Sequence, residues 1–320
     1  MLASLSLLGW PGGAPALSIL IYHRVLPTPD PLRPGEIDAA LFESQLTFLA
    51  RHFELMTVSD AAAALREGRL PRRAACITFD DGYADNWTVA HPILARHDAK
   101  ATVFVATGYL NGGRMFSDTV IEFVRLAPGP VLDLSAVGMG RHPVATVQER
   151  LQAITALQVQ LKYLAPDERD AQVRRMLAAV PVGALPDDLM LTDAQLRQLA
   201  DAGHEIGGHT VDHTVLTTLT PEGARAQVAR GRDHLAALLD RPIRSFAYPN
   251  GRPVRDYDAG HAAMLKELGF EAAVSTSAGV ARRGADPFQL PRYTPWGASI
   301  TMFAARLMRN ARMGAPAAVV

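Results

Sequence analysis

Two short segments of the sequence carry side chains that could form a metal-dependent hydrolytic site. Asp80 and Asp81 directly follow the apolar run at residues 74–79. Far downstream, His209 and His213 are four residues apart and follow the segment His-Glu-Ile-Gly-Gly at residues 204–208. One carboxylate and two imidazoles suffice for a catalytic metal site with an open position, and the second carboxylate is then free to act as a base. The combination predicts a metal-dependent hydrolase.

Each segment alone also has an explanation that involves no function. Adjacent aspartates at the end of a strand often serve as turn or helix-capping residues. Two histidines at this spacing are often incidental surface residues. Because both segments occur in one chain and each closes an apolar strand, we favour a shared metal site. Asp212, between the two histidines, is interpreted as a loop or supporting residue rather than a ligand.

The elements that must position these residues alternate between strands and helices. Short apolar runs of β type separated by helical patterns are typical of repeated βα units around a parallel sheet or barrel. The expected strands are residues 18–22, 54–58, 74–79, 101–105, 205–208, 243–248, 271–275 and 288–292. His23, the two aspartates, His209 and the segment Tyr-Pro-Asn-Gly at residues 248–251 each lie at the end of one of these strands, and Arg292 ends the last. In a βα barrel such strand ends converge on one face, where active sites lie.

Capping signals indicate where several helices begin. Ser59 is expected to cap a helix that stops near Gly68. Thr192 and Gln195 form a capping box, and Thr220 precedes a proline at the first position of another helix.

From about residue 114 to residue 191 the alternation of strands and helices is interrupted. Thr146 and Glu149 form a capping box, and apolar residues then recur at helical spacing. A second helix is expected to start at Pro166. We interpret this segment as a helical insertion within a single domain spanning residues 1–320. We favour a purely structural excursion, with a wall or lid for the cleft as the alternative.

The composition is that of an ordinary folded protein and argues against several classes of function. The 320 residues are 48% apolar and 20% charged, which permits a sizeable core. Lys and Arg total 32, as do Asp and Glu, so no overall basic field predicts a nucleic-acid or anionic-membrane partner. Cys76 is the only cysteine, which excludes an intramolecular disulfide and a Cys-based zinc site. We expect it to be a buried, inert thiol.

The N-terminus lacks the pattern of a signal peptide. Residues 2–8 are mildly apolar, but the first basic residue after the start is Arg24, so the positively charged beginning of a signal peptide is missing. The apolar run at residues 18–22 is too short to cross a bilayer. We therefore expect no membrane span and favour a cytoplasmic location, with association with a bacterial envelope as the alternative.

Three segments resemble the motifs of the polysaccharide deacetylases, which form carbohydrate esterase family 4. They are Thr-Phe-Asp-Asp-Gly-Tyr at residues 78–83, His-Thr-Val-Asp-His at 209–213 and Phe-Ala-Tyr-Pro-Asn-Gly at 246–251. The opening Tyr-His-Arg-Val at residues 22–25 is similar to that of the branch acting on bacterial exopolysaccharide. The resemblance runs from about residue 19 to residue 292, apart from the insertion. It implies the chitooligosaccharide-deacetylase homology fold, a distorted (β/α) barrel of about seven parallel strands.

The resemblance also implies a role for individual residues. Carried over by position, Asp80 is the general base. Asp81, His209 and His213 are the ligands of a divalent metal, with zinc as the default, although cobalt, nickel or iron fit similar ligands. The backbone N–H of Asn250 is the implied oxyanion donor, and Tyr248 belongs to the same substrate-binding segment.

Two departures from the family pattern concern the surroundings of the base. The family commonly has an Arg two residues before the proline of the third motif, where this chain has Ala247. Arg292 is expected to supply the guanidinium instead and to pair bidentately with Asp80, or else to form an ordinary ion pair at a strand end. The family's late Leu-x-His segment, which provides a general acid, is not found. His23 is the candidate replacement by its location, with a supporting or packing role as the alternative.

These observations predict metal-dependent removal of N-acetyl groups from N-acetylhexosamine units of a polysaccharide or oligosaccharide, so the expected partner is an acetylated glycan. One alternative is hydrolysis of another non-peptide C–N bond, as in an allantoin-like small amide. A second is a non-catalytic glycan-binding or assembly protein on the same fold. The intact set of Asp80, Asp81 and the two histidines argues against the second alternative, because a binding module does not need a spare base.

Overall fold

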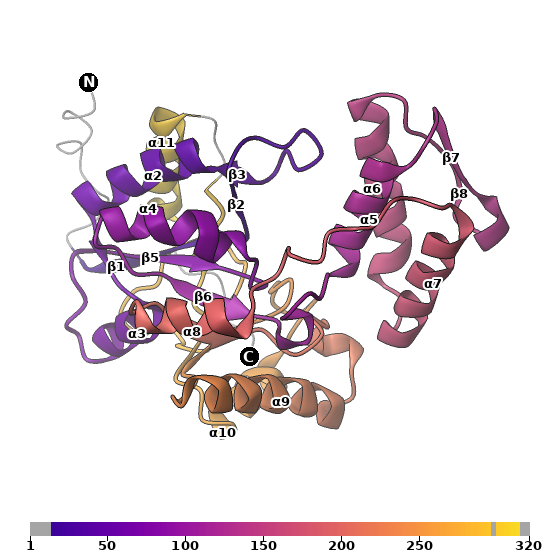
Figure 1. Cartoon of the computed structure of the whole chain (residues 1–320). Helices are drawn as coiled ribbons and strands as arrows, with labels where there is room; N and C mark the ends of the chain where they lie inside the picture. The colour runs from indigo at the N-terminus through magenta and orange to yellow at the C-terminus, as the bar shows by residue number, and fades with distance from the viewer. Residues whose placement is uncertain (1–13, 296–298, 314–320) are drawn as a thin grey trace. The chain divides into compact units, whose positions relative to one another are not determined.

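The computed structural model describes residues 14–295 and 299–313 of the chain. The chain divides into two compact units (Figure 1). The first contains the chain up to residue 28, residues 36–110 and the chain from residue 191 onward, and the second contains residues 29–35 and 111–190. The expectation about a signal peptide concerns residues 2–8, which lie outside the described residues.

The first unit is built around a nearly closed barrel of parallel strands, as the sequence predicts. Seven strands follow one another in the order β11-β10-β9-β6-β5-β1-β12, and β4 pairs with β5 outside this path. Their bounds are β1 Ala16–Tyr22, β4 Glu54–Leu55, β5 Arg73–Phe79, β6 Thr102–Val105, β9 Glu205–Gly208, β10 Ser245–Ala247, β11 Ala272–Val274 and β12 Arg292–Tyr293. A parallel bridge between Val274 and Leu290 links β11 to the segment before β12. Each strand overlaps its expected range, although Arg292 begins β12 instead of ending a strand.

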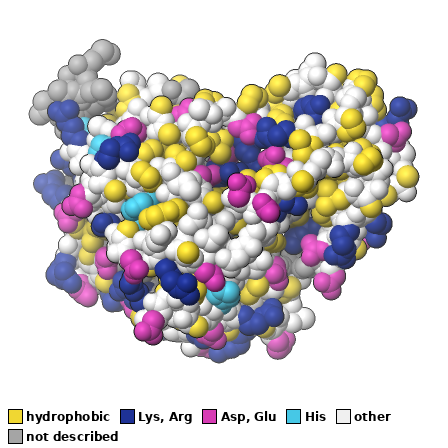
Figure 2. Space-filling model, in the orientation of Figure 1, with side chains coloured by type: hydrophobic (Ala, Val, Ile, Leu, Met, Phe, Trp, Pro, Cys, Tyr) yellow, Lys and Arg dark blue, Asp and Glu magenta, His cyan; other side chains and the backbone are white. Residues whose placement is uncertain are grey.

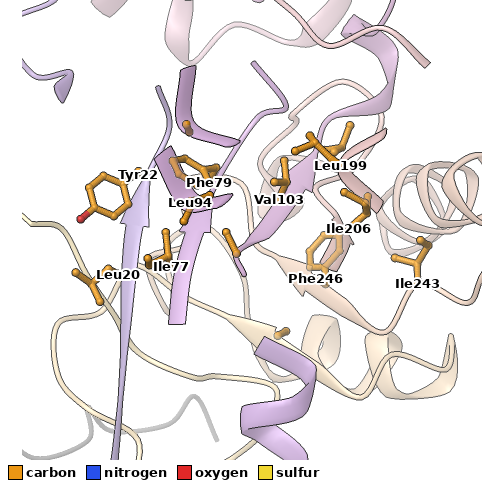
Figure 3. Packing of buried hydrophobic residues seen from close by; sticks show 14 of the residues in the cluster. Leu20, Tyr22, Ile77, Phe79, Leu94, Val103, Leu199, Ile206, Ile243 and Phe246 are labelled. Atoms are coloured by element: carbon orange, nitrogen blue, oxygen red, sulfur yellow. The ribbon is translucent and has the colours of Figure 1, made fainter. Parts of the chain in front are cut away.

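Several of these strands are nearly continuous apolar runs, because both faces of the sheet are covered. All seven residues of β1 are buried, and β5 is buried except for its first residue. Tyr22 pairs with Phe79 where these two strands end. Figure 3 shows both rings in the same core as Leu20 and Ile77. Burial of each such aliphatic side chain contributes roughly 1.5–3 kcal/mol.

Helices cover this barrel, and several begin at the expected capping residues. The helices of the first unit are α2 Ala39–His52, α3 Val58–Arg66, α4 His91–Arg96, α8 Asp193–Asp201, α9 Pro221–Leu239, α10 Ala259–Glu267 and α11 Ile300–Arg312. Shorter elements are the strands β2 Val25–Leu26 and β3 Ile37–Asp38, the π-helical turn η1 Asn86–Ala90, and the 3-10 turns η2 Thr107–Tyr109 and η4 Leu216–Thr218. The capping box of Thr192 with Gln195 and the cap at Thr220 are both confirmed.

The start of α3 differs from the sequence prediction. Thr57, not Ser59, is the N-cap residue. The N–H and the hydroxyl of Ser59 both donate to the carboxylate of Glu205 at the start of β9. The same carboxylate accepts hydrogen bonds from the hydroxyls of Thr102 and Ser245. Rules based on neighbouring residues could not predict this contact, because the acceptor comes from a strand far along the chain.

Gly207 allows the strands next to β9 to pack closely. A Cβ atom on Gly207 would lie 2.5 Å from Cδ1 of Phe104 on β6 and 2.9 Å from Oγ of Ser245 on β10. Neither distance is compatible with a side chain at this position. The close packing holds in place the strand that leads directly to His209.

The second unit is the helical insertion, together with a hairpin that the sequence pattern did not predict. Its elements are α5 Phe116–Leu126, β7 Val131–Leu134, the 3-10 turn η3 Ser135–Val137, β8 Gly140–Pro143, α6 Val147–Lys162 and α7 Pro166–Ala179. Figure 1 shows α5, α6 and α7 packed beside one another, and the capping box at Thr146 is confirmed. The unit has its own apolar core. Arg33 joins the segment 29–35 to α5 through Asp118 at 2.7 Å and Glu122 at 3.0 Å.

Charged side chains of both signs are interspersed over the face of the molecule shown in Figure 2. Among the described residues, no helix combines the length and the apolar character needed to cross a membrane.

Candidate active site

Three side chains meet where the parallel strands of the barrel end. Asp81 lies two residues beyond β5, His209 follows β9 directly, and His213 is four residues farther along the same loop. One ligand atom from each residue lies within 4.8 Å of the others. Oδ1 of Asp81 is 3.4 Å from Nε2 of His209 and 3.4 Å from Nε2 of His213. The structure therefore brings together the three residues that the sequence grouped as ligands.

The three ligand atoms fit a divalent metal ion. Bonds of about 2.0–2.1 Å to a tetrahedral ion place neighbouring ligand atoms about 3.4 Å apart. Oδ1 of Asp81 is buried and makes no hydrogen bond within the described part of the chain. Nδ1 of His209 lies 2.7 Å from the carbonyl oxygen of Ala247, so it carries the proton of the neutral ring and leaves the lone pair of Nε2 toward Asp81. This donor set suits zinc and related transition metals.

Asp80 is held by a buried ion pair, separately from the ligand cluster. Nη1 and Nη2 of Arg292 lie 2.6 Å and 2.7 Å from the two carboxylate oxygens of Asp80. The guanidinium also donates to the carbonyl oxygen of Ser275 and to the hydroxyl of Thr78. The Arg292 side chain has no exposed surface. A bidentate contact of this kind fixes both oxygens of Asp80 in one orientation, without any contribution from the Ala247 side chain.

Burial and neighbouring charges set the protonation of these groups. Burial opposes ionisation of Asp80, but the Arg292 charge outweighs it and lowers the pKa of Asp80. Burial also opposes ionisation of Asp81, yet the imidazoles that face it lower its pKa well below the usual range. Burial lowers the pKa of His213 to about 4. Burial would likewise lower the pKa of His209, but the facing Asp81 carboxylate and the charge of Asp80 raise it. Both carboxylates are therefore ionised near neutral pH.

The loops of the site use left-handed backbone at residues other than glycine. The φ angles are 76° at Asp81, 64° at Thr210, 51° at His213 and 58° at Asn250. For a residue with a Cβ atom this conformation costs about 1–2 kcal/mol. Such residues persist only where their surroundings hold them, and they gather at functional sites.

The segment after β10 keeps its Tyr248 side chain inside the protein. The N–H and the hydroxyl of Tyr248 both donate to backbone carbonyl oxygens, and its ring stacks on Tyr257 with the centroids 3.7 Å apart. Both donors of Tyr248 are thus engaged within the fold. Asn250 lies two residues farther on, where the Thr276 hydroxyl donates to its carbonyl oxygen at 2.7 Å. This bond orients the Asn250 backbone.

His23 follows β1 at the same end of the barrel, and its side chain is exposed. Burial opposes ionisation of Asp80 and Asp81, and a positive charge on His23 is among the interactions that nevertheless lower the pKa of both. Asn86, the first residue of η1, donates to the carbonyl oxygen of His23 at 2.9 Å. Sequence reasoning missed Asn86 because a π-helical turn, though frequent at functional sites, has no spacing signature of its own.

Comparison with known proteins gives the family. The family model described as polysaccharide deacetylase matches residues 67–273, which contain the Asp80–Asp81 pair, His209, His213 and the segment after β10. The chain belongs to the polysaccharide deacetylase family.

Two curated proteins illustrate how far this family likeness extends. YxkH of Bacillus subtilis (strain 168), which is named for the same family, is 22% identical over 278 residues, or 86% of this chain and 70% of that protein. The poly-β-1,6-N-acetyl-D-glucosamine N-deacetylase of Staphylococcus aureus (strain MSSA476) is 31% identical over 75 residues, or 23% of this chain and 26% of that protein. The second match therefore spans about a quarter of either chain.

Two solved structures have the same fold as this chain. PplD of Streptococcus pyogenes, in complex with acetate, superposes with a TM-score of 0.61 and 20% identity, covering 92% of this chain and 98% of that one. IcaB from Ammonifex degensii superposes with a TM-score of 0.61 and 21% identity, with the same coverage of 92% and 98%.

Proposed function

We propose that this chain removes N-acetyl groups from N-acetylhexosamine units of a polysaccharide or oligosaccharide by metal-dependent hydrolysis. The observation that carries the proposal is the cluster of Asp81, His209 and His213 beside a carboxylate that is held separately. Three ligand atoms at metal-binding distances suit an ion, and Asp80, paired with Arg292 instead of with the ligands, suits a base. A glycan-binding module would need neither feature.

Asp81, His209 and His213 would hold the divalent ion, with zinc as the default for this donor set. When bound, such an ion supplies a Lewis acid that polarises the acetyl carbonyl and lowers the pKa of water at the site. The chain contributes the spacing of the ligand atoms. It also contributes the tautomer of His209, which the hydrogen bond to Ala247 sets.

Asp80 acts in this proposal as the general base that takes a proton from the attacking water. Its lowered pKa keeps it ionised, so it can accept a proton near neutral pH. Arg292 is a positioning residue. It binds both oxygens of Asp80, and its guanidinium stays protonated, so it cannot itself act as the base. Proton transfer to a positioned base typically contributes about 10²–10⁴-fold in rate.

His23 and Asn250 complete the proposed reaction. The backbone N–H of Asn250 donates to the acetyl oxygen as negative charge develops on it. His23 gives a proton to the amine nitrogen as the C–N bond breaks, so that acetate and a free amine leave. Tyr248 supports this segment through its stack on Tyr257.

The proposed substrate class follows from the relatives. The Staphylococcus aureus protein is named as a deacetylase of poly-β-1,6-N-acetyl-D-glucosamine, and the likeness to it covers 75 residues. Together with membership in the polysaccharide deacetylase family, this supports an N-acetylglucosamine polymer as the first substrate to test.

Acetate release from a small set of substrates tests the proposal. The zinc-loaded protein is incubated with oligomers of N-acetylglucosamine and, separately, with allantoin as a small cyclic amide. We expect acetate from the glycan, loss of this activity with a chelator, and recovery when zinc is restored. Ring opening of allantoin without acetate release from glycans would support the small-amide alternative. Glycan binding with no hydrolysis would support a non-catalytic role.

A further inference from the structure

We propose that Gln227 on α9 is a positioning residue that holds the loop carrying His213 in the geometry needed to bind metal. The inference rests on the proposed function, because it concerns the metal site made by Asp81, His209 and His213. It adds a residue that belongs to none of the motifs and that hydrogen-bonds to Val211 and Asp212, between the two histidines.

The carboxamide of Gln227 makes three hydrogen bonds to the loop between the two histidines. Oε1 accepts from the N–H groups of Val211 and Asp212, both at 3.1 Å. Nε2 donates to Oδ2 of Asp212 at 2.7 Å. The orientation of the amide is determined, because only its oxygen can accept from two N–H groups. One side chain thus binds both backbone and side chain of the segment next to His213.

The opposite side of this loop is held by η2 (Thr107–Tyr109). The N–H groups of its first two residues donate to the carbonyl oxygens of Thr210 and Val211, at 3.3 Å and 2.8 Å. A Cβ atom at Gly108 would lie 2.9 Å from the Val211 oxygen and 2.8 Å from Oδ1 of Asp212. The loop is therefore clamped between η2 and the Gln227 side chain, with no room for a larger residue at Gly108.

α9 also approaches the loop directly, one helical turn beyond Gln227. A Cβ atom at Gly231 would lie 3.1 Å from the carbonyl oxygen of Thr210. Gln227 lies on the same stripe of α9 as Gly231 and the buried Ala224 and Val228. A polar residue within an otherwise apolar stripe is the sequence signal that could have pointed to Gln227.

The clamp matters because the loop has an unfavourable backbone. Thr210 and His213 both have left-handed φ angles, of 64° and 51°. When the hydrogen bonds of Gln227 are removed, the loop can relax toward more favourable conformations. Nε2 of His213 then leaves its position 3.4 Å from Oδ1 of Asp81. Loss of a residue that supports a ligand typically weakens metal binding by about 10–100-fold.

The zinc dissociation constant of the full chain, measured by competition with a chromophoric chelator, tests this inference. Gln227→Met keeps the size of the side chain but loses all three hydrogen bonds, so we expect zinc binding to weaken by about 10–100-fold. We also expect a changed visible spectrum of the Co²⁺-loaded protein, which reports coordination geometry. His234→Met, an exposed position on the same helix, is the matched control and should bind zinc like the wild type.

A reciprocal exchange separates positioning from general stability. Gln227→Glu places two carboxylates face to face and should weaken zinc binding, whereas Asp212→Asn keeps an acceptor for Nε2 and should not. In the double variant Q227E/D212N the amide at position 212 can donate to the carboxylate at position 227. The hydrogen bond is thereby restored with its direction reversed, so zinc affinity should return to within about threefold of the wild type.

Thermal unfolding of the apoproteins completes the test. An unchanged zinc affinity in Gln227→Met, even with a lower unfolding midpoint, would overturn the inference, as would a double variant no better than Gln227→Glu. If the wild-type protein itself takes up no zinc, cobalt, nickel or iron, the proposed function fails and the inference with it.

Discussion

Asp80 and Asp81 are neighbours in the chain, but their side chains have different partners. Asp80 lies against Arg292, and Asp81 faces the two imidazoles. The backbone of Asp81 is left-handed, with a φ angle of 76°, where the two side chains turn toward different partners. Residue types and strand-end positions predicted which side chains gather here. The individual roles came from the family pattern, because spacing alone does not tell a base from a ligand.

The contact between Asp80 and Arg292 leads to a test at a single residue. Arg292→Lys keeps the positive charge but cannot bind both carboxylate oxygens with a planar fork. We expect turnover to fall by about 10–100-fold while bound metal stays unchanged. Lysine is preferable to an apolar residue, since leaving Asp80 buried and unpaired costs about 3–5 kcal/mol. Arg225→Lys at an exposed ion pair with Glu267 is the control. Wild-type turnover in Arg292→Lys would contradict a positioning role.

His23 offers a second test at this scale. As the proposed general acid it assists departure of the amine, so His23→Ala should lower turnover by about 10²-fold or more. Its side chain is exposed, and therefore folding and metal content should be preserved. Activity is measured together with zinc content and unfolding midpoint. A rate close to that of the wild type would leave His23 without a catalytic role.

At the scale of elements, strands such as β1 and β5 were predictable because they are nearly continuous apolar runs. The hairpin of β7 and β8 was not, because β8 has no buried residue and β7 only two. The contact of Ser59 with Glu205 was also missed, since it joins elements that are far apart in the sequence. Local patterns therefore identified the elements that position the site, but not the contacts that connect those elements.

The residue directly before β9 is His204, whose titration should affect stability. Nδ1 of His204 accepts from the N–H of Ala101, so Nε2 carries the proton and donates to His91 at 2.9 Å. Burial lowers the pKa of His204 to about 4, and the charges of His91 and Lys100 act in the same direction. In the unfolded chain the pKa is about 6.5. Below that pH the unfolded state binds the proton more readily, so the free energy of unfolding falls as pH decreases toward 4.

Urea denaturation of the wild type and of His204→Gln at several pH values measures this effect. Relative to the variant, the wild type should lose about 2–3 kcal/mol between pH 7 and pH 4. His234→Gln, at an exposed position, should follow the wild type. Parallel pH profiles for the wild type and His204→Gln would show that His204 is not the group responsible.

At the scale of the whole molecule, a barrel unit carries the candidate site, and the insertion forms a unit with its own core. The sequence predicted the insertion at about residues 114–191, and the structure assigns residues 111–190 to this unit. Residues 29–35 belong to it as well. They were missed because the ion pairs of Arg33 with Asp118 and Glu122 bridge distant parts of the sequence. Family membership and fold are established, and the proposed reaction depends on the side chains of Asp80, Asp81, His209, His213 and His23 at one end of the barrel.

The most direct test of the central claim is a paired measurement of bound zinc and acetate release for the wild type, Asp80→Asn and His209→Ala. Asp80→Asn should keep one zinc ion per chain and lose turnover by about 10²-fold or more, because only the base is removed. His209→Ala should lose the zinc, because a ligand is removed. Full turnover in Asp80→Asn, or undiminished zinc in His209→Ala, would contradict the division of this site into one base and three ligands.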